Sequence, residues 1–372
     1  MAGRVFGAAA TIVGSFPHTD PDRLVDQLIA RLPEVPAWPQ LPARDWRESM
    51  YVQYSEHLPG AVIDDQAQRI FFRVDDGFEA QLERFYQALV DEDVEHFAIS
   101  REYAAGLHVF LEKMAGGGPG LKPGAYETKT GPGLKPCPTG AIRQCLKGQV
   151  TGPFSFSMTV TDEGKRSLAY TPELREVAVQ GMAMKARWLA RRLRQLNDDV
   201  LVVLDEPYLC SFGSAFVNVA REDVIAAIDA ACAAIHAEGA LAGLHCCGNT
   251  DWALVLATGI DVLNFDAYQF FHGLPLYPAE LSAFLERGGT LSWGIVPTST
   301  AIETTSAADL LRMLDERIEQ LAGKGIDRAR LYSQALLTPS CGLGTQTVAV
   351  AERVLDTLVE LTALARSREA AW

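Results

Sequence analysis

Short apolar runs, each followed by polar residues and then by a helical pattern, recur along the whole chain. Nearly continuous aliphatic runs are typical of strands that are buried on both faces of a parallel sheet. We predict eight such strands, at residues 8–13, 94–99, 146–150, 200–204, 241–244, 261–265, 290–296 and 330–337. Eight strands that alternate with helices predict an α/β fold of the (β/α)8 TIM barrel type, with residues 1–372 forming one domain.

Polar side chains gather at the carboxyl ends of the predicted strands. In a (β/α)8 barrel the active site lies at this end, because the loops that follow the strands meet there. The residues in such positions are Ser15, Asp205, Glu206, His245, Cys247, Asp266 and Cys341. We therefore expect a functional site built from these side chains, with the first strand lying beside the last.

Three of these residues are ligands of the kind that zinc prefers. His245 and Cys247 are two positions apart at a strand end, so their side chains point to the same side. Cys341 ends another apolar run. A catalytic zinc uses three protein ligands of this type and keeps a position open for substrate. The alternative interpretation is packing, because free cysteine is among the most buried residue types.

Carboxylates end two further strands. Asp266 follows the strand after the His-Cys strand, where it could be a fourth zinc ligand, a partner for His245, or a solvated loop residue. Asp205 and Glu206 could bind a substrate ammonium group, act as acid and base, or cap the next helix. Capping alone rarely needs two carboxylates, so we interpret this pair as substrate-binding.

The ligand set favours chemistry on a thiol. Thiolate ligands donate charge to zinc and reduce its Lewis acidity, whereas a thiol that coordinates zinc is deprotonated. The thiolate is the competent nucleophile at neutral pH. Deaminases also combine His and Cys ligands, but their two cysteines are spaced as Cys-x-x-Cys, whereas Cys246 and Cys247 are adjacent.

Two segments interrupt the alternation of strands and helices. Residues 33–75 are punctuated by prolines and lack clear periodicity, so we expect a lid-like excursion or an ordered surface loop at the barrel mouth. Residues 115–140 are too rich in Gly and Pro to form a helix or strand, which predicts a mobile loop.

Composition limits the possible partners and compartments. The formal net charge of −14 disfavours nucleic acid and anionic membranes as partners. No run of about 18 apolar residues occurs, so we expect no membrane span. The N-terminus has no pattern of a secretory signal. An odd count of 7 cysteines, two of them adjacent, is expected of a protein in the reducing cytoplasm.

Four motifs together resemble a known family. They are Thr11-Ile-Val-Gly-Ser-Phe-Pro17, Asp205-Glu-Pro207, His245-Cys-Cys247 and Pro339-Ser-Cys-Gly-Leu343. In this order they resemble the C-terminal catalytic barrel of cobalamin-independent methionine synthase, over roughly residues 8–364. His245-Cys-Cys-Gly-Asn-Thr250 is similar to zinc methyltransferases that move methyl groups between corrinoid proteins and thiols. Both groups belong with uroporphyrinogen decarboxylase in one barrel superfamily.

The resemblance implies roles for individual residues. His245, Cys247 and Cys341 would be the zinc-binding catalytic residues, and Asp266 stands where the synthase has a glutamate ligand. Ser15 and the backbone around Gly14 would hold the carboxylate of an amino acid substrate, and Asp205 its ammonium group. The implied activity is a zinc-dependent methyl transfer to a thiol, with homocysteine as the best candidate and methionine as the product.

The methyl donor is expected to differ from that of the synthase. The full synthase has an additional N-terminal barrel and uses a folate, and this chain has no counterpart of that half. We therefore expect methylcobalamin or another methylated corrinoid, either free or on a corrinoid carrier protein.

Two other functions remain open from the sequence. A metal-free decarboxylase of the uroporphyrinogen type would need an aspartate and arginines facing an acidic tetrapyrrole, and Arg44, Asp45 and Arg47 could serve. That function would leave His245, Cys247 and Cys341 unexplained. A non-catalytic corrinoid-binding module is the third possibility.

Overall fold

The central element is a curled parallel sheet of seven strands, in the order β1-β9-β8-β7-β6-β5-β4. The computed structural model describes residues 6–116 and 144–369. The strands of this sheet are β1 (Ala9–Ala10), β4 (Leu146–Thr151), β5 (Val200–Asp205), β6 (Leu241–Cys246), β7 (Val262–Phe265), β8 (Thr290–Val296) and β9 (Ala335–Pro339). Every residue of β5 and of β8 is buried, as expected of parallel strands covered on both faces.

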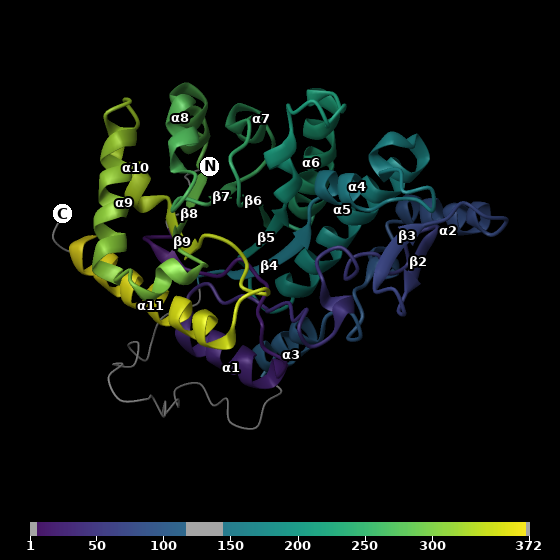
Figure 1. Ribbon diagram of the computed structural model, residues 1–372, viewed down its shortest axis with the longest axis horizontal. Helices are drawn as coiled ribbons and strands as arrows, with labels where there is room; N and C mark the ends of the chain where they lie inside the picture. Colours follow the sequence, from purple (N-terminus) through teal and green to yellow (C-terminus); the bar gives the residue numbers. More distant parts are fainter. Residues whose placement is uncertain (1–5, 117–143, 370–372) are drawn as a thin grey trace.

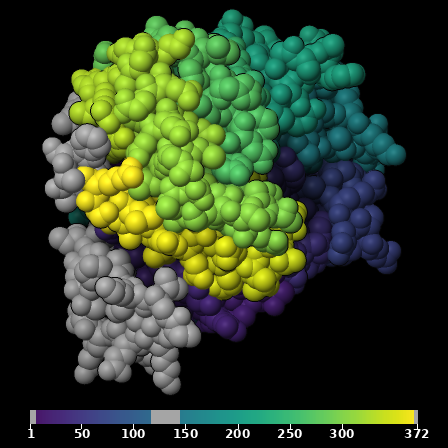
Figure 2. All heavy atoms as spheres, turned by 60° about the vertical axis from the view of Figure 1, so that its left-hand side comes forward, coloured from purple at the N-terminus to yellow at the C-terminus, as the bar shows by residue number. Residues whose placement is uncertain are grey.

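Most of the helices lie around the convex side of the sheet, whereas α2 lies away from it, at the right of Figure 1. The helices of the described residues are α1 (Pro21–Arg31), α2 (Phe78–Val90), α3 (Ala105–Met114), α4 (Pro153–Thr159), α5 (Pro172–Arg194), α6 (Arg221–His236), α7 (Trp252–Leu256), α8 (Pro278–Glu286), α9 (Ala307–Ala322), α10 (Arg328–Ser333) and α11 (Val348–Glu369). Figure 2 shows the C-terminal third of the chain, coloured green to yellow, as one continuous layer on its side of the molecule. In the described part of the chain, no helix is both long and apolar enough to cross a membrane.

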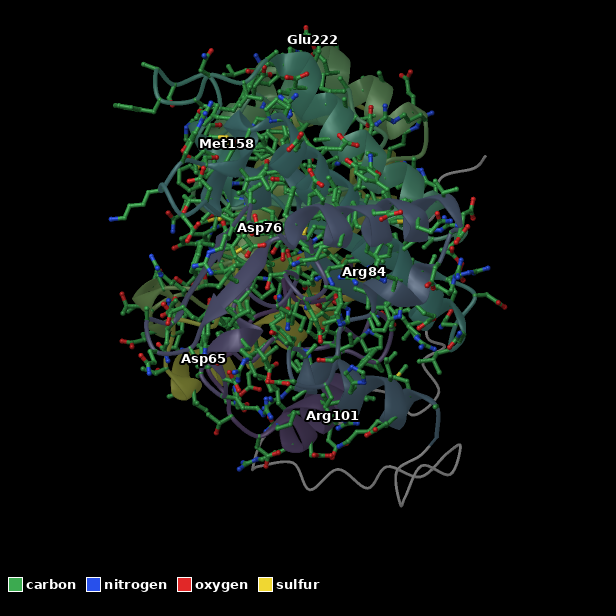
Figure 3. All side chains as sticks on the ribbon, turned by 90° about the vertical axis from the view of Figure 1, so that its right-hand side faces the viewer. Asp65, Asp76, Arg84, Arg101, Met158 and Glu222 are labelled. Atoms are coloured by element: carbon green, nitrogen blue, oxygen red, sulfur yellow. The ribbon has the colours of Figure 1, made fainter. Side chains whose placement is uncertain are left out.

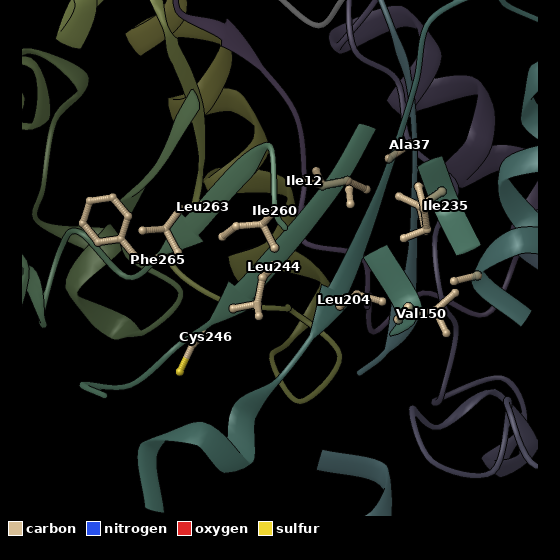
Figure 4. Packing of buried hydrophobic residues seen from close by; sticks show 14 of the residues in the cluster. Ile12, Ala37, Val150, Leu204, Ile235, Leu244, Cys246, Ile260, Leu263 and Phe265 are labelled. Carbon is tan, nitrogen blue, oxygen red and sulfur yellow. The ribbon is translucent and has the colours of Figure 1, made fainter. Parts of the chain in front are cut away.

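The two faces of the sheet bury different side chains. Val202 and Leu204 of β5 belong to the large hydrophobic cluster that includes residues of the helices. Leu204 and Ile235 of α6 are two members of this cluster that Figure 4 labels. Leu201 and Val203 belong to a smaller cluster to which none of the described helices contributes, so this cluster fills the concave interior of the sheet. Because side chains alternate along a strand, Asp205 points to the same interior as Val203.

The prediction of a closed barrel of eight strands is wrong for the described residues. Residues 94–99 were expected to be the second strand, but Val94–Phe97 form a short 3-10 helix, η2, outside the sheet. The side chains of Val94 and Phe97 are buried. A spacing of three residues brings both to one side of a 3-10 turn, whereas a strand would separate them.

A proline-rich segment lies between the two edge strands instead. Within residues 35–40, Gln40 makes an isolated parallel bridge with Ser15, and Ala37 makes another with Lys147 of β4. Pro36 and Pro39 have no backbone N–H and therefore cannot donate to a regular ladder. The first part of the predicted excursion is thus a buried connection between β1 and β4.

The rest of the excursion has secondary structure of its own. It contains a 3-10 helix, η1 (Trp46–Glu48), and an antiparallel hairpin of β2 (Ala61–Asp64) and β3 (Arg69–Phe72). Most of the Gly- and Pro-rich segment at residues 115–140 lies outside the described residues.

Candidate metal centre

His245, Cys247 and Cys341 meet at the carboxyl ends of the strands. His245 is the penultimate residue of β6, Cys247 directly follows that strand, and Cys341 follows β9. Their potential ligand atoms all lie within 4.8 Å of one another. One imidazole nitrogen and two sulfurs at this separation form a donor set that suits zinc, with room for a further ligand.

The imidazole of His245 is buried without a hydrogen-bond partner. Its exposed fraction is 4%, and neither Nδ1 nor Nε2 is hydrogen-bonded within residues 6–116 and 144–369. Leaving a buried polar atom unpaired costs about 1–3 kcal/mol. A metal ion bound to one ring nitrogen would satisfy that atom, so the histidine fits the role of a ligand.

The charge states of the three side chains are coupled. Burial alone would lower the pKa of His245, but the nearby Cys247 sulfur and the carboxyl group of Asp205 raise it. The contact between the two sulfurs raises the pKa of Cys247 and lowers the pKa of Cys341. Cys341 is therefore the thiol that ionises first, and ionised sulfur is the form that binds a metal.

Asp266 is not a member of this group. Its carboxylate accepts the backbone N–H of Gln269 at 2.8 Å in the loop after β7. Burial raises the pKa of Asp266, while the backbone hydrogen bonds from Gln269 and Tyr268 and then the charges of His245 and Arg317 oppose this effect. In this structure Asp266 lies near the three potential ligands, and its side chain stabilises the loop after β7 through the hydrogen bond from Gln269.

A cavity of about 450 Å³ opens onto the three residues. Its other lining residues include Ser15, Asp205, Glu48, Met50 and Gly342. A volume of this size is in the range of small-molecule sites. The lining of the cavity combines residues at the strand ends with residues 40–50 of the segment that was predicted to be an excursion.

Asp205 presents an unpaired carboxylate oxygen at the edge of this cavity. It is the register partner of His245 in the neighbouring strand, and its Oδ1 is buried with no hydrogen-bond partner among the described residues. Burial raises the pKa of Asp205, whereas His245 and Lys147 lower it. An unpaired buried carboxylate is suited to a cationic group of a ligand.

Glu206 has a different environment from its neighbour. Its carboxylate accepts the backbone N–H groups of Phe154 at 3.0 Å and Ser155 at 2.7 Å, at the start of α4. A Cβ at Gly152 would overlap this carboxylate. Burial raises the pKa of Glu206 to about 7. Glu206 is fully buried and its oxygens are occupied by the protein itself.

Ser15 follows β1 and lies close to the loop that follows β9, the neighbouring strand in the sheet. Its Oγ accepts the backbone N–H of Gly344 at 3.3 Å, and its carbonyl accepts that of Leu343 at 2.8 Å. A Cβ at Gly342 would overlap Ser15 Oγ, so this approach requires glycine. The carbonyl of Gly14 accepts the N–H of Gln40 at 3.0 Å and is engaged within the fold.

Two charged residues near the site were missing from the sequence interpretation. Lys147 is fully enclosed on β4, donates to the carbonyl of Val13 and to Gln149, and has a pKa lowered by burial to about 8. Glu48 is fully buried, lines the cavity, and has a pKa raised by burial to about 7. The signal available for Lys147 was a charged residue inside a predicted buried strand, whereas no signal marked Glu48.

The arginines considered for a decarboxylase are paired with carboxylates of this chain. Arg44 contacts Glu48 at 2.6 Å. Arg47 contacts Asp65 at 2.7 Å, with Glu102 and Asp45 further away. These pairings reduce the positive charge that an acidic tetrapyrrole would meet.

This chain is similar to a known protein in structure and not in sequence. The sequence matches no protein-family model and no curated protein. Among solved structures, the chain is similar to a B12-independent methionine synthase from Shewanella sp. W3-18-1 in complex with selenomethionine. The sequence identity is 16% and the TM-score is 0.44, over 62% of this chain and 64% of that chain. The match thus spans less than two thirds of the length of the synthase chain.

Proposed function

We propose that this protein is a zinc-dependent methyltransferase that transfers a methyl group to a small thiol. The observation that carries the proposal is the convergence of His245, Cys247 and Cys341, whose potential ligand atoms lie within 4.8 Å of one another at the floor of a cavity. A zinc ion, when bound there, lowers the pKa of a thiol that reaches it.

The remaining residues of the cavity support an amino acid as the thiol substrate. The unpaired Oδ1 of Asp205 binds the substrate ammonium group. Ser15 and the glycine-containing backbone that follows Cys341 hold the substrate carboxylate on the other side of the cavity. Homocysteine carries a thiol, an ammonium and a carboxylate group, and is the substrate we propose.

The methyl donor in this proposal is a methylated corrinoid, free or on a carrier protein. The substrate sulfur supplies the electron pair of the new sulfur–carbon bond, and the pair of the broken cobalt–carbon bond stays on the corrinoid. The thiol proton leaves to solvent when the thiol enters the site. Holding both reactants in line inside the cavity supplies much of the acceleration.

The proposal is tested by metal removal. Purified protein is incubated with methylcobalamin and homocysteine, and methionine is measured before chelation, after chelation, and after zinc is restored. We expect methionine formation to be lost on chelation and to return with zinc. Turnover that persists after complete removal of metal would contradict the proposal, and tight porphyrin binding by the same metal-free protein would favour the decarboxylase alternative.

A further inference from the structure

Two sulfur atoms of the candidate metal centre lie close enough to react with each other. The Sγ atoms of Cys247 and Cys341 are within 4.8 Å of each other. Both side chains are half-buried and line the cavity of about 450 Å³, so a small molecule that enters the cavity meets both sulfurs. The two sulfurs of a disulfide are about 2.05 Å apart, so a closure of no more than about 3 Å would join them.

The backbone at both cysteines is suited to a movement of this size. Cys247 and Cys341 each lie in a bend just outside the strands, and each is followed directly by a glycine. Segments outside a sheet open and adjust more easily than the strands themselves, because fewer backbone hydrogen bonds hold them. The sulfurs can therefore approach each other while the sheet keeps its register.

The other cysteines that the structure describes are placed differently. Cys145, Cys232 and Cys246 are buried, and Cys246 packs in the large hydrophobic cluster. Cys210 is exposed and packs against Gly248, but it is not a member of the group of three potential ligands. Cys210 is therefore the competing thiol against which a reaction between Cys247 and Cys341 is tested.

An oxidised sulfur at this position meets a second thiol at once. A hydroperoxide oxidises one thiol to a sulfenic acid and is itself reduced to an alcohol, or to water if it is hydrogen peroxide. The neighbouring sulfur then attacks the sulfenic sulfur, the sulfur–oxygen bond breaks, and water leaves as the disulfide forms. In total, two thiols give two electrons and two protons to one peroxide. Proximity makes this second step effectively unimolecular.

We propose that Cys247 and Cys341 form a reversible disulfide on exposure to a hydroperoxide, and that this bond switches the metal centre off. Zinc binds cysteine as the thiolate, and a disulfide has no thiolate, so two of the three potential ligands are lost in one step. Reduction by a dithiol restores both thiols. The disulfide follows from the position of the two sulfurs alone, whereas its effect on zinc rests on the metal centre of the proposed function.

The disulfide is tested on the metal-free protein with hydrogen peroxide as the probe. Free thiols are alkylated after the reaction, and peptides are mapped by mass spectrometry without reduction. We expect a cross-linked peptide pair that contains Cys247 and Cys341, in the wild type and equally in Cys210→Ser. The cross-link should disappear with dithiothreitol and be absent from Cys341→Ser.

Other products in the wild-type map would overturn the proposal. They are a cross-link of Cys247 or Cys341 to Cys210, a cross-link of either to Cys137, which lies outside the described residues, or sulfinic acid without any cross-link. The wild-type map alone decides between these products, so the result does not depend on the folding of a variant.

Two methionines serve as internal references for exposure to peroxide. Met50 lines the same cavity, whereas Met158 of α4, which Figure 3 labels, has an exposed fraction of 5%. A thioether is oxidised to a sulfoxide and cannot form a disulfide. We expect the disulfide at peroxide doses that leave both methionines unmodified. Oxidation of Met50 before any disulfide appears would show that the two thiols are not the preferred target in the cavity.

The effect on the metal is measured on the zinc-loaded protein with a chromogenic chelator. We expect about one zinc ion to be released for each disulfide formed, and to be bound again after reduction. A disulfide that forms while zinc stays bound would overturn the switch. A protein that never binds zinc would contradict the proposed function instead, and the cross-link in the metal-free protein would still decide whether the disulfide exists.

Discussion

The sulfur atoms of Cys247 and Cys341 lie within 4.8 Å of each other, although β7 and β8 separate their strands in the sheet. Neighbouring strands are about 4.8 Å apart, so three such steps in a flat sheet would place the two strand ends roughly 14 Å apart. The short distance therefore comes from the curl of the sheet, and the candidate metal centre exists only in the curled form.

We predict that Cys341→Ser lowers the zinc content of the purified protein. The hydroxyl of serine is a poor zinc ligand compared with a thiolate, so one of three ligands is lost. Zinc is measured by mass spectrometry after exhaustive dialysis, with Cys210→Ser as the control. Cys210 is an exposed thiol that contacts the loop at Gly248 but is not one of the three potential ligands. Equal zinc content in both variants would exclude the assigned ligand set.

We predict that Asp205→Asn raises the KM for homocysteine by about 10- to 100-fold. The reason is the loss of a charge-assisted contact with the substrate ammonium group, worth about 1.5–3 kcal/mol. The chemical control is 4-mercaptobutyrate, which has the same thiol and carboxylate but no amino group. Its KM should change little. If both thiols are affected equally, Asp205 does not recognise the ammonium group.

We predict that Glu206→Ala destabilises the fold by about 3 kcal/mol or more. The substitution leaves two buried N–H groups, those of Phe154 and Ser155, without an acceptor, at about 1–3 kcal/mol each. Urea unfolding measures the effect, and Glu360→Ala on the exposed side of α11 is the control, with an expected change within about 0.5 kcal/mol. Similar stability of both variants would show that Glu206 is not needed to anchor α4.

We predict a pH-dependent stability difference between Lys185→Met and the wild type. Burial lowers the folded-state pKa of Lys185 from 10.5 to about 8, against the opposing charge of Glu56. A depressed folded pKa contributes stability above about pH 10.5, and this contribution is lost as the pH falls to about 8. Over that window the wild type should lose up to about 3 kcal/mol relative to Lys185→Met, with no further change below about pH 8.

The measurement is urea unfolding at several pH values in chloride buffer without phosphate. The control is Lys324→Met, which replaces an exposed lysine just after α9. Parallel stability curves for the wild type and Lys185→Met would mean that the ammonium of Lys185 is compensated within the protein.

Much of the sheet could be predicted from the sequence. The apolar run at residues 200–204 corresponds to β5, and the run at 290–296 coincides with β8. Both strands could be predicted because strands that are buried on both faces carry mostly apolar residues along their whole length. The run at residues 330–337 was less informative, since its first part forms α10 and β9 begins only at Ala335.

The sequence by itself determined the parallel sheet and placed His245, Cys247 and Cys341 at strand ends, because hydrophobic periodicity and ligand chemistry are local properties. Only the tertiary structure decided how the space between β1 and β4 is filled, since the proline-rich residues 35–40 have no strand pattern of their own. The tertiary structure also gave two adjacent carboxylates different environments, because Asp205 faces the cavity whereas Glu206 accepts hydrogen bonds from the start of α4. Adjacent residues of one type differ in this way because their surroundings come from distant parts of the chain.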